Sequence, residues 1–153
     1  MFGFLKKWFK TGQVETKEES IQQEFTVNTY DIDIAGHVNN IAYLRWVEEL
    51  RVKLIYRSFT LEKLLEIGYF PIVSETTIRY KRAIKMFSKV TGKMWVDDFK
   101  HSIWVLKFEI YANGELSAKG TQKVALMNIH NETMETIDER LIREFEKYKK
   151  TRK

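Results

Sequence analysis

The chain has 153 residues, of which 44% are hydrophobic and 31% charged, a composition typical of one globular domain with a buried core. Its net charge of +5 is concentrated in residues 140–153, which we interpret as a solvated helix end, so we expect no nucleic-acid partner. The absence of cysteine excludes a disulfide framework and a thiol nucleophile. No apolar run approaches the roughly 20 residues that span a bilayer, and the N-terminus lacks the pattern of a signal peptide, so we expect a cytoplasmic protein.

The first ten residues, MFGFLKKWFK, separate into two faces on a helical wheel. One face is apolar and aromatic and the other carries the lysines, which favours a helix lying on the inner face of an anionic membrane. The alternative is that these aromatic side chains pack on the protein itself. Residues 11–23 are polar and predict a linker. We therefore expect an amphipathic segment and linker over residues 1–23 and one domain over residues 24–153.

The domain begins with a predicted strand and a long helix and continues with four strands. Alternation of apolar and polar residues predicts a strand over residues 24–30, and a helical period predicts helices over residues 40–57 and 60–67. After Pro71 the period becomes strand-like and predicts strands at 72–84, 86–96, 101–111 and 116–129, with turns at Asp97-Asp98 and Asn113-Gly114. Thr136 and Glu139 form a capping box that predicts a final helix.

This order of elements predicts an α+β fold in which antiparallel strands pack against one helix. A single helix cannot cover both faces of such a sheet, or its edges. We therefore expect the chain to pair with a second copy as a homodimer, with a tetramer as the open alternative.

The polar loop before the long helix is the strongest candidate for chemistry. Asp31, Asp33, Gly36 and His37 precede the helix, whose first N–H groups lack internal partners and carry partial positive charge. Such donors can polarise a carbonyl, and a carboxylate such as Asp33 can attack that carbonyl or activate water. The alternative is that these residues only form turns and cap the helix. No serine-hydrolase or nucleotide-binding glycine motif occurs, and three isolated histidines without cysteine do not predict a metal site.

The loop and the helix together resemble a known family. Residues 31–40, DIDIAGHVNN, match D-x-D-x-x-G-H-V-N-N, residues 43–48, YLRWVE, match Y-L-x-W-x-E, and the combination resembles the 4-hydroxybenzoyl-CoA thioesterase-like family. The resemblance implies a hotdog fold over residues 24–130, in which a five-stranded antiparallel sheet wraps around one long central helix, with the C-terminal helix as an addition. It also implies hydrolysis of a fatty or aryl acyl-CoA to free acid and CoA without a cofactor or metal.

The resemblance also assigns roles to residues. Asp33 takes the position of the catalytic aspartate, as nucleophile or general base, and a backbone N–H near residues 39–41 would hold the carbonyl oxygen. Glu48 is an alternative carboxylate, which we interpret instead as the ion-pair partner of Arg51. Sites of the family lie between two subunits. The residues expected to bind substrate are His37, Asn39, Asn40, Ile41, Tyr43, Lys81 and Arg82.

The cations Lys81, Arg82 and Lys85 are candidates to meet the phosphates of CoA, although exposed cations at a strand end are common. Two other functions are also compatible with the sequence. One is hydrolysis of an acyl thioester carried by an acyl carrier protein. The other is binding of acyl thioesters or lipids at the membrane surface without hydrolysis.

Overall fold

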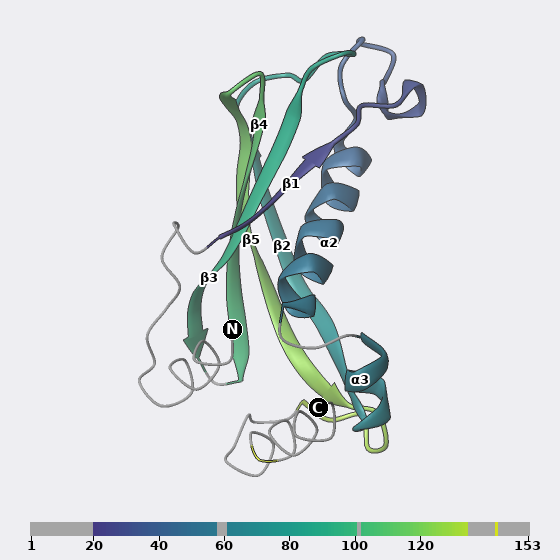
Figure 1. Ribbon diagram of the computed structural model, residues 1–153, viewed down its shortest axis with the longest axis vertical. Helices are drawn as coiled ribbons and strands as arrows, with labels where there is room; N and C mark the ends of the chain where they lie inside the picture. The colour runs from purple at the N-terminus through teal and green to yellow at the C-terminus, as the bar shows by residue number, and fades with distance from the viewer. Residues whose placement is uncertain (1–19, 58–60, 101, 135–142, 144–153) are drawn as a thin grey trace.

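The computed structural model describes residues 20–57, 61–100, 102–134 and 143 of the chain. These residues form one antiparallel sheet with strand order β1-β3-β4-β5-β2, and a long helix lies along one face of it (Figure 1). The predicted α+β arrangement of five antiparallel strands around one central helix is confirmed. The strands are β1 (Ile21–Phe25), β2 (Tyr69–Tyr80), β3 (Val90–Lys100), β4 (Ile103–Ala112) and β5 (Glu115–Asn128), and the helical elements are the 3-10 turn η2 (Thr29–Asp31), α2 (Asn40–Tyr56) and α3 (Leu61–Glu66).

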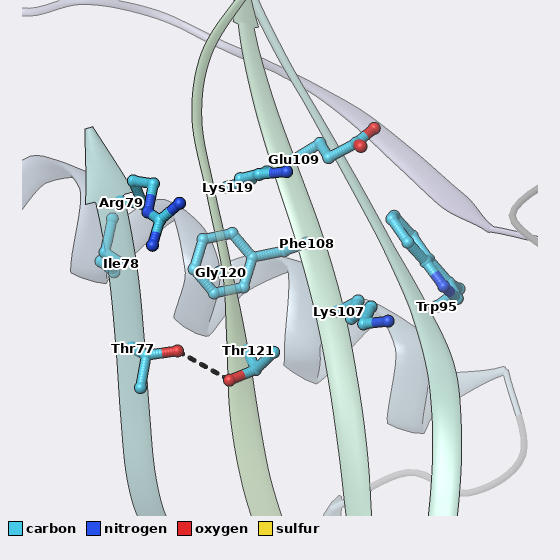
Figure 2. Close-up of a pocket in the computed structure, with 10 residues that line it drawn as sticks. All are labelled: Thr77, Ile78, Arg79, Trp95, Lys107, Phe108, Glu109, Lys119, Gly120 and Thr121. Atoms are coloured by element: carbon cyan, nitrogen blue, oxygen red, sulfur yellow. Dashed lines mark hydrogen bonds between the residues drawn. The ribbon is translucent and has the colours of Figure 1, made fainter. Parts of the chain in front are cut away.

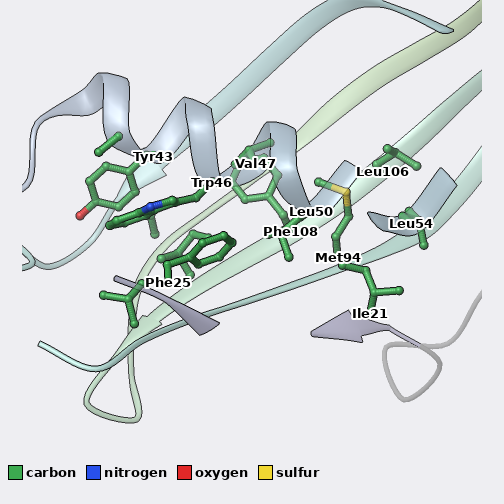
Figure 3. Packing of buried hydrophobic residues seen from close by; sticks show 14 of the residues in the cluster. Ile21, Phe25, Tyr43, Trp46, Val47, Leu50, Leu54, Met94, Leu106 and Phe108 are labelled. Atoms are coloured by element: carbon green, nitrogen blue, oxygen red, sulfur yellow. The ribbon is translucent and has the colours of Figure 1, made fainter. Parts of the chain in front are cut away.

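Helix α2 forms the core together with the inner face of the sheet. Trp46 of α2 stacks on Phe25 of β1, with 5.4 Å between the ring centroids (Figure 3). Gly92 in β3 allows the side chains of Phe25 and Leu50 to pack closely against the backbone of the strand. A Cβ atom at this position would lie 2.7 Å from Phe25 and 2.8 Å from Leu50. The apolar side chains of α2 recur at spacings of three and four, as a helix buried along one face requires. Those that are buried are Ala42, Tyr43, Trp46, Val47, Leu50 and Leu54.

The predicted first strand, residues 24–30, is displaced, since β1 spans Ile21–Phe25 and begins inside the predicted linker. The chain leaves the extended conformation because the carboxylate of Asp31 accepts a hydrogen bond from the Asn28 N–H at 2.8 Å, which closes the turn η2. The strands predicted at 72–84 and 86–96 are also shifted. Strand β2 ends at Tyr80 and β3 starts at Val90, so that residues 81–89 form a connection.

The two predicted turns have different outcomes. Asp97-Asp98 is not a turn: the pair lies inside β3, where the register shifts between Val96 and Asp98, and a bulge of this kind accommodates one extra residue. Asp97 there forms an ion pair with Lys107 at 2.9 Å. The predicted turn at Asn113-Gly114 is confirmed, with φ angles of 52° and 83° between β4 and β5.

Some predictions concern residues that the structure does not describe. The amphipathic segment at residues 1–10, most of the linker, and the final helix with its Thr136–Glu139 capping box lie outside the described ranges. Within the described ranges, no helix has the length and apolar character needed to cross a membrane.

Candidate active site

The loop from Asp31 to Asn39 is held in a closed, hairpin-like shape by its own backbone. Ile32 and Val38 form an isolated antiparallel bridge. Inside it, the Asp33 N–H donates to the His37 carbonyl at 2.8 Å, and the Gly36 N–H donates to the Asp33 carbonyl at 2.9 Å. Gly36 has a φ of 78°, a conformation that glycine adopts without steric cost. The loop therefore presents its side chains in one defined arrangement at the start of α2.

Asp33 is exposed at this loop, and its two carboxylate oxygens differ in their surroundings. Oδ1 accepts hydrogen bonds from the backbone N–H groups of Ala35 at 2.9 Å and His37 at 3.2 Å. Oδ2 accepts no hydrogen bond from the described part of the chain. One oxygen thus forms the turn, and the other is left to act on a ligand. The turn-forming and chemical interpretations of Asp33 are compatible.

Asp31 has a different role, because its side chain is only 1% exposed. It accepts hydrogen bonds from the Asn28 backbone at 2.8 Å and the Asn28 side chain at 3.2 Å, and it forms an ion pair with Arg45 of α2. Burial alone raises the pKa of the Asp31 carboxyl, but the hydrogen bonds from Asn28 and the Arg45 guanidinium outweigh it, so the net pKa lies below its ordinary value. Asp31 is an ionised anchor of the loop.

The N-terminus of α2 offers hydrogen-bond donors to a ligand. The side chain of Asn39 caps the helix by accepting from the Ala42 N–H at 2.9 Å, and its amide nitrogen donates to the Tyr30 carbonyl at 3.3 Å. Both ends of the Asn39 side chain are therefore engaged within the protein. Asn40 and Ile41 follow in the first helical turn, where no preceding helical carbonyl can accept their N–H groups, and both residues are exposed. These two amides are the donors best placed for a carbonyl oxygen.

Tyr43, the next predicted site residue, faces the core, and only 2% of its surface is exposed. Its ring meets the ring of Tyr80 edge-on, with centroids 5.0 Å apart. Burial and the neighbouring Tyr80 raise the pKa of Tyr43 to about 12, against a hydrogen bond with the Ile84 backbone that lowers it. The hydroxyl of Tyr43 is therefore protonated at neutral pH and cannot be a base. Tyr80 was not predicted individually, although strand alternation from Ile78 places it on the helix side of β2.

His37 is half-buried in the loop, and its backbone carbonyl and N–H both bond to Asp33. Lys81 and Arg82 follow β2, and their N–H groups both donate to the Ser117 carbonyl, at 2.8 and 3.1 Å. Their side chains are exposed, and that of Arg82 forms an ion pair with Glu115 at 2.5 Å. The connection that carries these cations touches the loop, because the Val38 N–H donates to the Ile84 carbonyl at 2.8 Å. It reaches the same end of the molecule as the start of α2 (Figure 1).

Glu48 belongs to a polar chain farther along α2. It forms an ion pair with Arg51 at 2.6 Å, and Arg51 donates to Gln122 of β5 at 3.2 Å. Gln122 in turn donates to Thr76 of β2 at 3.1 Å. The interpretation of Glu48 as half of an ion pair with Arg51 is confirmed.

A hollow of about 520 Å³ lies on the face of the sheet opposite to α2 (Figure 2). Lys107 and Trp95 line it, and they alternate along their strands with Phe108 and Met94, which pack in the core with α2. Phe108 also borders the hollow, beside Gly120, which has no side chain to cover it. None of the predicted site residues lines this hollow. In the part of the chain that the structure describes, no three His, Asp or Glu side chains come together as a metal site.

The chain belongs to the thioesterase-like superfamily, whose family model matches residues 27–145. By class it is a thioester hydrolase, as the resemblance implied. No curated protein matches the chain significantly.

Solved structures share the fold. One is a DHNA-CoA thioesterase from Staphylococcus aureus, with 23% identity over 86% of this chain and 90% of that chain and a TM-score of 0.75. Another is a hypothetical protein from Staphylococcus aureus in complex with CoA, with 16% identity over 86% and 85% of the two chains and a TM-score of 0.74. A probable thioesterase from Escherichia coli has 20% identity over 82% and 95%, with a TM-score of 0.73. At these identities the likeness establishes the fold, and the predicted hotdog fold is confirmed.

Proposed function

We propose that the protein is an acyl-CoA thioesterase in which Asp33 is the catalytic carboxylate. The observation that carries this proposal is the arrangement of Asp33, with Oδ1 held by two loop N–H groups and Oδ2 left open. The N–H groups of Asn40 and Ile41 lie at the start of the helix that follows the same loop. A thioester carbonyl held by these amides is polarised toward the oxyanion that forms during attack.

Two routes are compatible with this arrangement. Asp33 attacks the carbonyl carbon, which expels the CoA thiolate and leaves an acyl-aspartyl anhydride that water then hydrolyses. Alternatively, Asp33 takes a proton from water, and the resulting hydroxide attacks the same carbon. Both routes give the free acid and CoA, and neither requires a metal or a redox cofactor.

The proposed substrate is a fatty or aryl acyl-CoA. Support comes from similar structures that carry the names of CoA thioesterases or were solved with CoA. The exposed cations Lys81 and Arg82 are suited to the phosphates of CoA. Acyl thioesters of a carrier protein are the alternative substrates, and they would use the same thioester chemistry.

We further propose that the working unit is a homodimer, or a tetramer made of two such dimers, in which the second copy completes the site. Strand β2 is an edge of the sheet, with β5 as its neighbour. Large apolar side chains are exposed along β2 and at the start of α2, and a second copy would cover them: Ile41, Leu44, Phe70, Val73 and Tyr80. We place the enzyme in the cytoplasm, with residues 1–10 as a proposed contact to the membrane. Binding of lipids or acyl thioesters without hydrolysis is the rival function at that surface.

A panel of acyl-CoA and aryl-CoA thioesters, assayed by release of free thiol, tests the catalytic proposal. Asp33→Asn is expected to lower kcat by about 10²- to 10⁴-fold, the usual contribution of a positioned acid or base. Glu62→Gln, an exposed carboxylate of α3, is the matched control and should retain wild-type turnover. Equal turnover by Asp33→Asn and wild type would remove Asp33 from this role. Ligand binding without thiol release from any thioester would favour the rival function.

A further inference from the structure

The connection between β2 and β3 holds a phenylalanine in an unusual position. Phe87 is 90% exposed, and its φ angle is 66°. It lies in a turn closed by a hydrogen bond from the Ser88 N–H to the Lys85 carbonyl at 3.2 Å. A bulky residue rarely adopts a positive φ. An aromatic ring that stays in water also lacks the stabilisation that burial of its apolar surface would provide. Such outliers cluster at ligand-binding sites.

The exposure of Phe87 does not arise from a loose segment, since the connection is fixed at its start, middle and end. Ser117 accepts hydrogen bonds from the first two N–H groups of the connection, and Val38 donates to the carbonyl of Ile84, which is itself buried. At the end, Lys89 and Asn113 exchange two hydrogen bonds, at 2.8 and 2.9 Å. The backbone therefore holds the ring of Phe87 outward.

A hollow of about 370 Å³ opens beside Phe87. Lys85 and Arg82 contribute cations to its wall, and Lys81 and Lys89 flank them in the sequence. Its wall includes one carboxylate, that of Glu115, which is paired with Arg82 at 2.5 Å. Proteins that bind nucleotides often combine an exposed aromatic ring, on which the base stacks, with nearby cations, which neutralise the phosphates of the nucleotide.

We propose that Phe87 is the stacking platform for the adenine of CoA and that Lys85, with Arg82, binds the phosphates of the same nucleotide. This inference rests on the proposed function and extends it. Ile84, three residues before Phe87, contacts both Val38 of the catalytic loop and Tyr43 of α2, so the nucleotide and thioester ends of one substrate meet the same end of the protein. A carrier-protein thioester has no adenine base. The subsite therefore selects acyl-CoA over acyl carrier protein.

The first test is binding of adenosine 3′,5′-bisphosphate, the nucleotide end of CoA, to the full chain by calorimetry. Phe87→Gly should weaken this binding about tenfold, whereas Phe87→Tyr keeps the ring and should bind like wild type. Glycine adopts a positive φ without strain, so Phe87→Gly should also raise the melting temperature, which separates lost binding from lost folding. No binding by the wild-type chain, or equal binding by Phe87→Gly, would overturn the proposal.

The second test is kinetic. Phe87→Gly should lower the preference for acyl-CoA over the matching acyl-pantetheine, expressed as the ratio of their kcat/KM values, about tenfold. An equal loss on both substrates would overturn the proposal. If no thioester is hydrolysed but the nucleotide binds through Phe87, the proposed function fails and the subsite stands. If Phe87→Gly weakens binding to phosphatidylglycerol vesicles and not to the nucleotide, the loop is a membrane contact and the subsite is wrong.

Discussion

Arg45 in the second turn of α2 forms an ion pair with the buried carboxylate of Asp31, and this pair ties the loop that carries Asp33 to the helix. The guanidinium of Arg45 also lies over the ring of Tyr30, 5.5 Å from its centroid. Asp31 accepts two further hydrogen bonds from Asn28. Since the Asn39 N–H bonds to the Asp31 carbonyl at 2.7 Å, the same residue also positions the helix cap. Asp31 and Arg45 thus set where Asp33 lies relative to the helix N-terminus.

Arg45→Met is expected to lower the free energy of unfolding by about 1–3 kcal/mol, because it leaves the Asp31 carboxylate buried with fewer donors. Methionine retains most of the aliphatic contact of arginine, so the decrease in the free energy of unfolding measures the contribution of the charge and the hydrogen bond. The measurement is urea unfolding of both proteins. Arg79→Met, an exposed cation of β2, is the control and should change stability by less than about 0.5 kcal/mol. Similar losses in both variants would show that the pair has no special contribution.

The Asp31 carboxyl should also give stability a defined pH dependence. Burial raises its pKa, but the hydrogen bonds from Asn28 and Arg45 lower it more, and the net pKa in the folded protein lies below the ordinary 3.8. The folded state therefore binds this proton more weakly than the unfolded state. The contribution to stability is fully present above the ordinary pKa and is lost as the pH falls through the folded pKa. The stability difference between wild type and Asp31→Asn should be constant near neutral pH and shrink in acid. A difference that grows in acid would mean that burial dominates.

The sequence pattern predicts much of the fold because the long helix and the strands around Asn113-Gly114 follow local rules. Residues 81–89 escaped prediction for a physical reason. Ile84 is buried and Met86 packs on the core, while Lys85 and Phe87 point outward, so the side chains alternate as in a strand although the backbone turns. Asp97-Asp98 gives the opposite error: the pair is typical of turns and predicts one, but it lies in a β-bulge inside β3.

The catalytic role of Asp33 stays a prediction from the motif. The different surroundings of Asp33 and Asp31 could not be predicted from the sequence, because they depend on contacts between residues far apart in the chain. Arg45 lies 14 residues from Asp31, and Tyr80 comes to Tyr43 from the edge strand. No local pattern encodes either contact. The exposure of the Phe87 ring could not be predicted from the sequence either, because a large apolar side chain ordinarily predicts burial.

Substitutions of Asn39 can separate two effects, the capping of α2 and the electrostatic potential at the N-terminus of this helix. Asn39→Ala should lower the free energy of unfolding by about 1 kcal/mol, because the Ala42 N–H loses its acceptor. Asn39→Asp should keep the cap, since a carboxylate accepts the same bond and favours the helix N-terminus. Its added negative charge, however, opposes the oxyanion that the Asn40 and Ile41 amides would stabilise. Asn39→Asp loses the exposed hydrogen bond to the Tyr30 carbonyl but keeps the cap, so it should be more stable than Asn39→Ala and still lose kcat on the best acyl-CoA. Parallel losses of stability and kcat in both variants would contradict a separate electrostatic role.

Two carboxylates, Asp33 in the loop and Glu48 in α2, are candidates for the chemistry, and substitutions distinguish them. Glu48 is 60% exposed and pairs with Arg51, whose side chain is only 10% exposed and also bonds to Gln122. Glu48→Gln preserves an acceptor for Arg51 and should change kcat by no more than about threefold, well below the loss from removing a catalytic acid or base. Arg51→Met, in contrast, should reduce stability by about 1–3 kcal/mol, because Gln122 loses its donor inside the core. A loss of activity in Glu48→Gln as large as that in Asp33→Asn, with unfolding unchanged, would transfer the catalytic role from the loop to the helix.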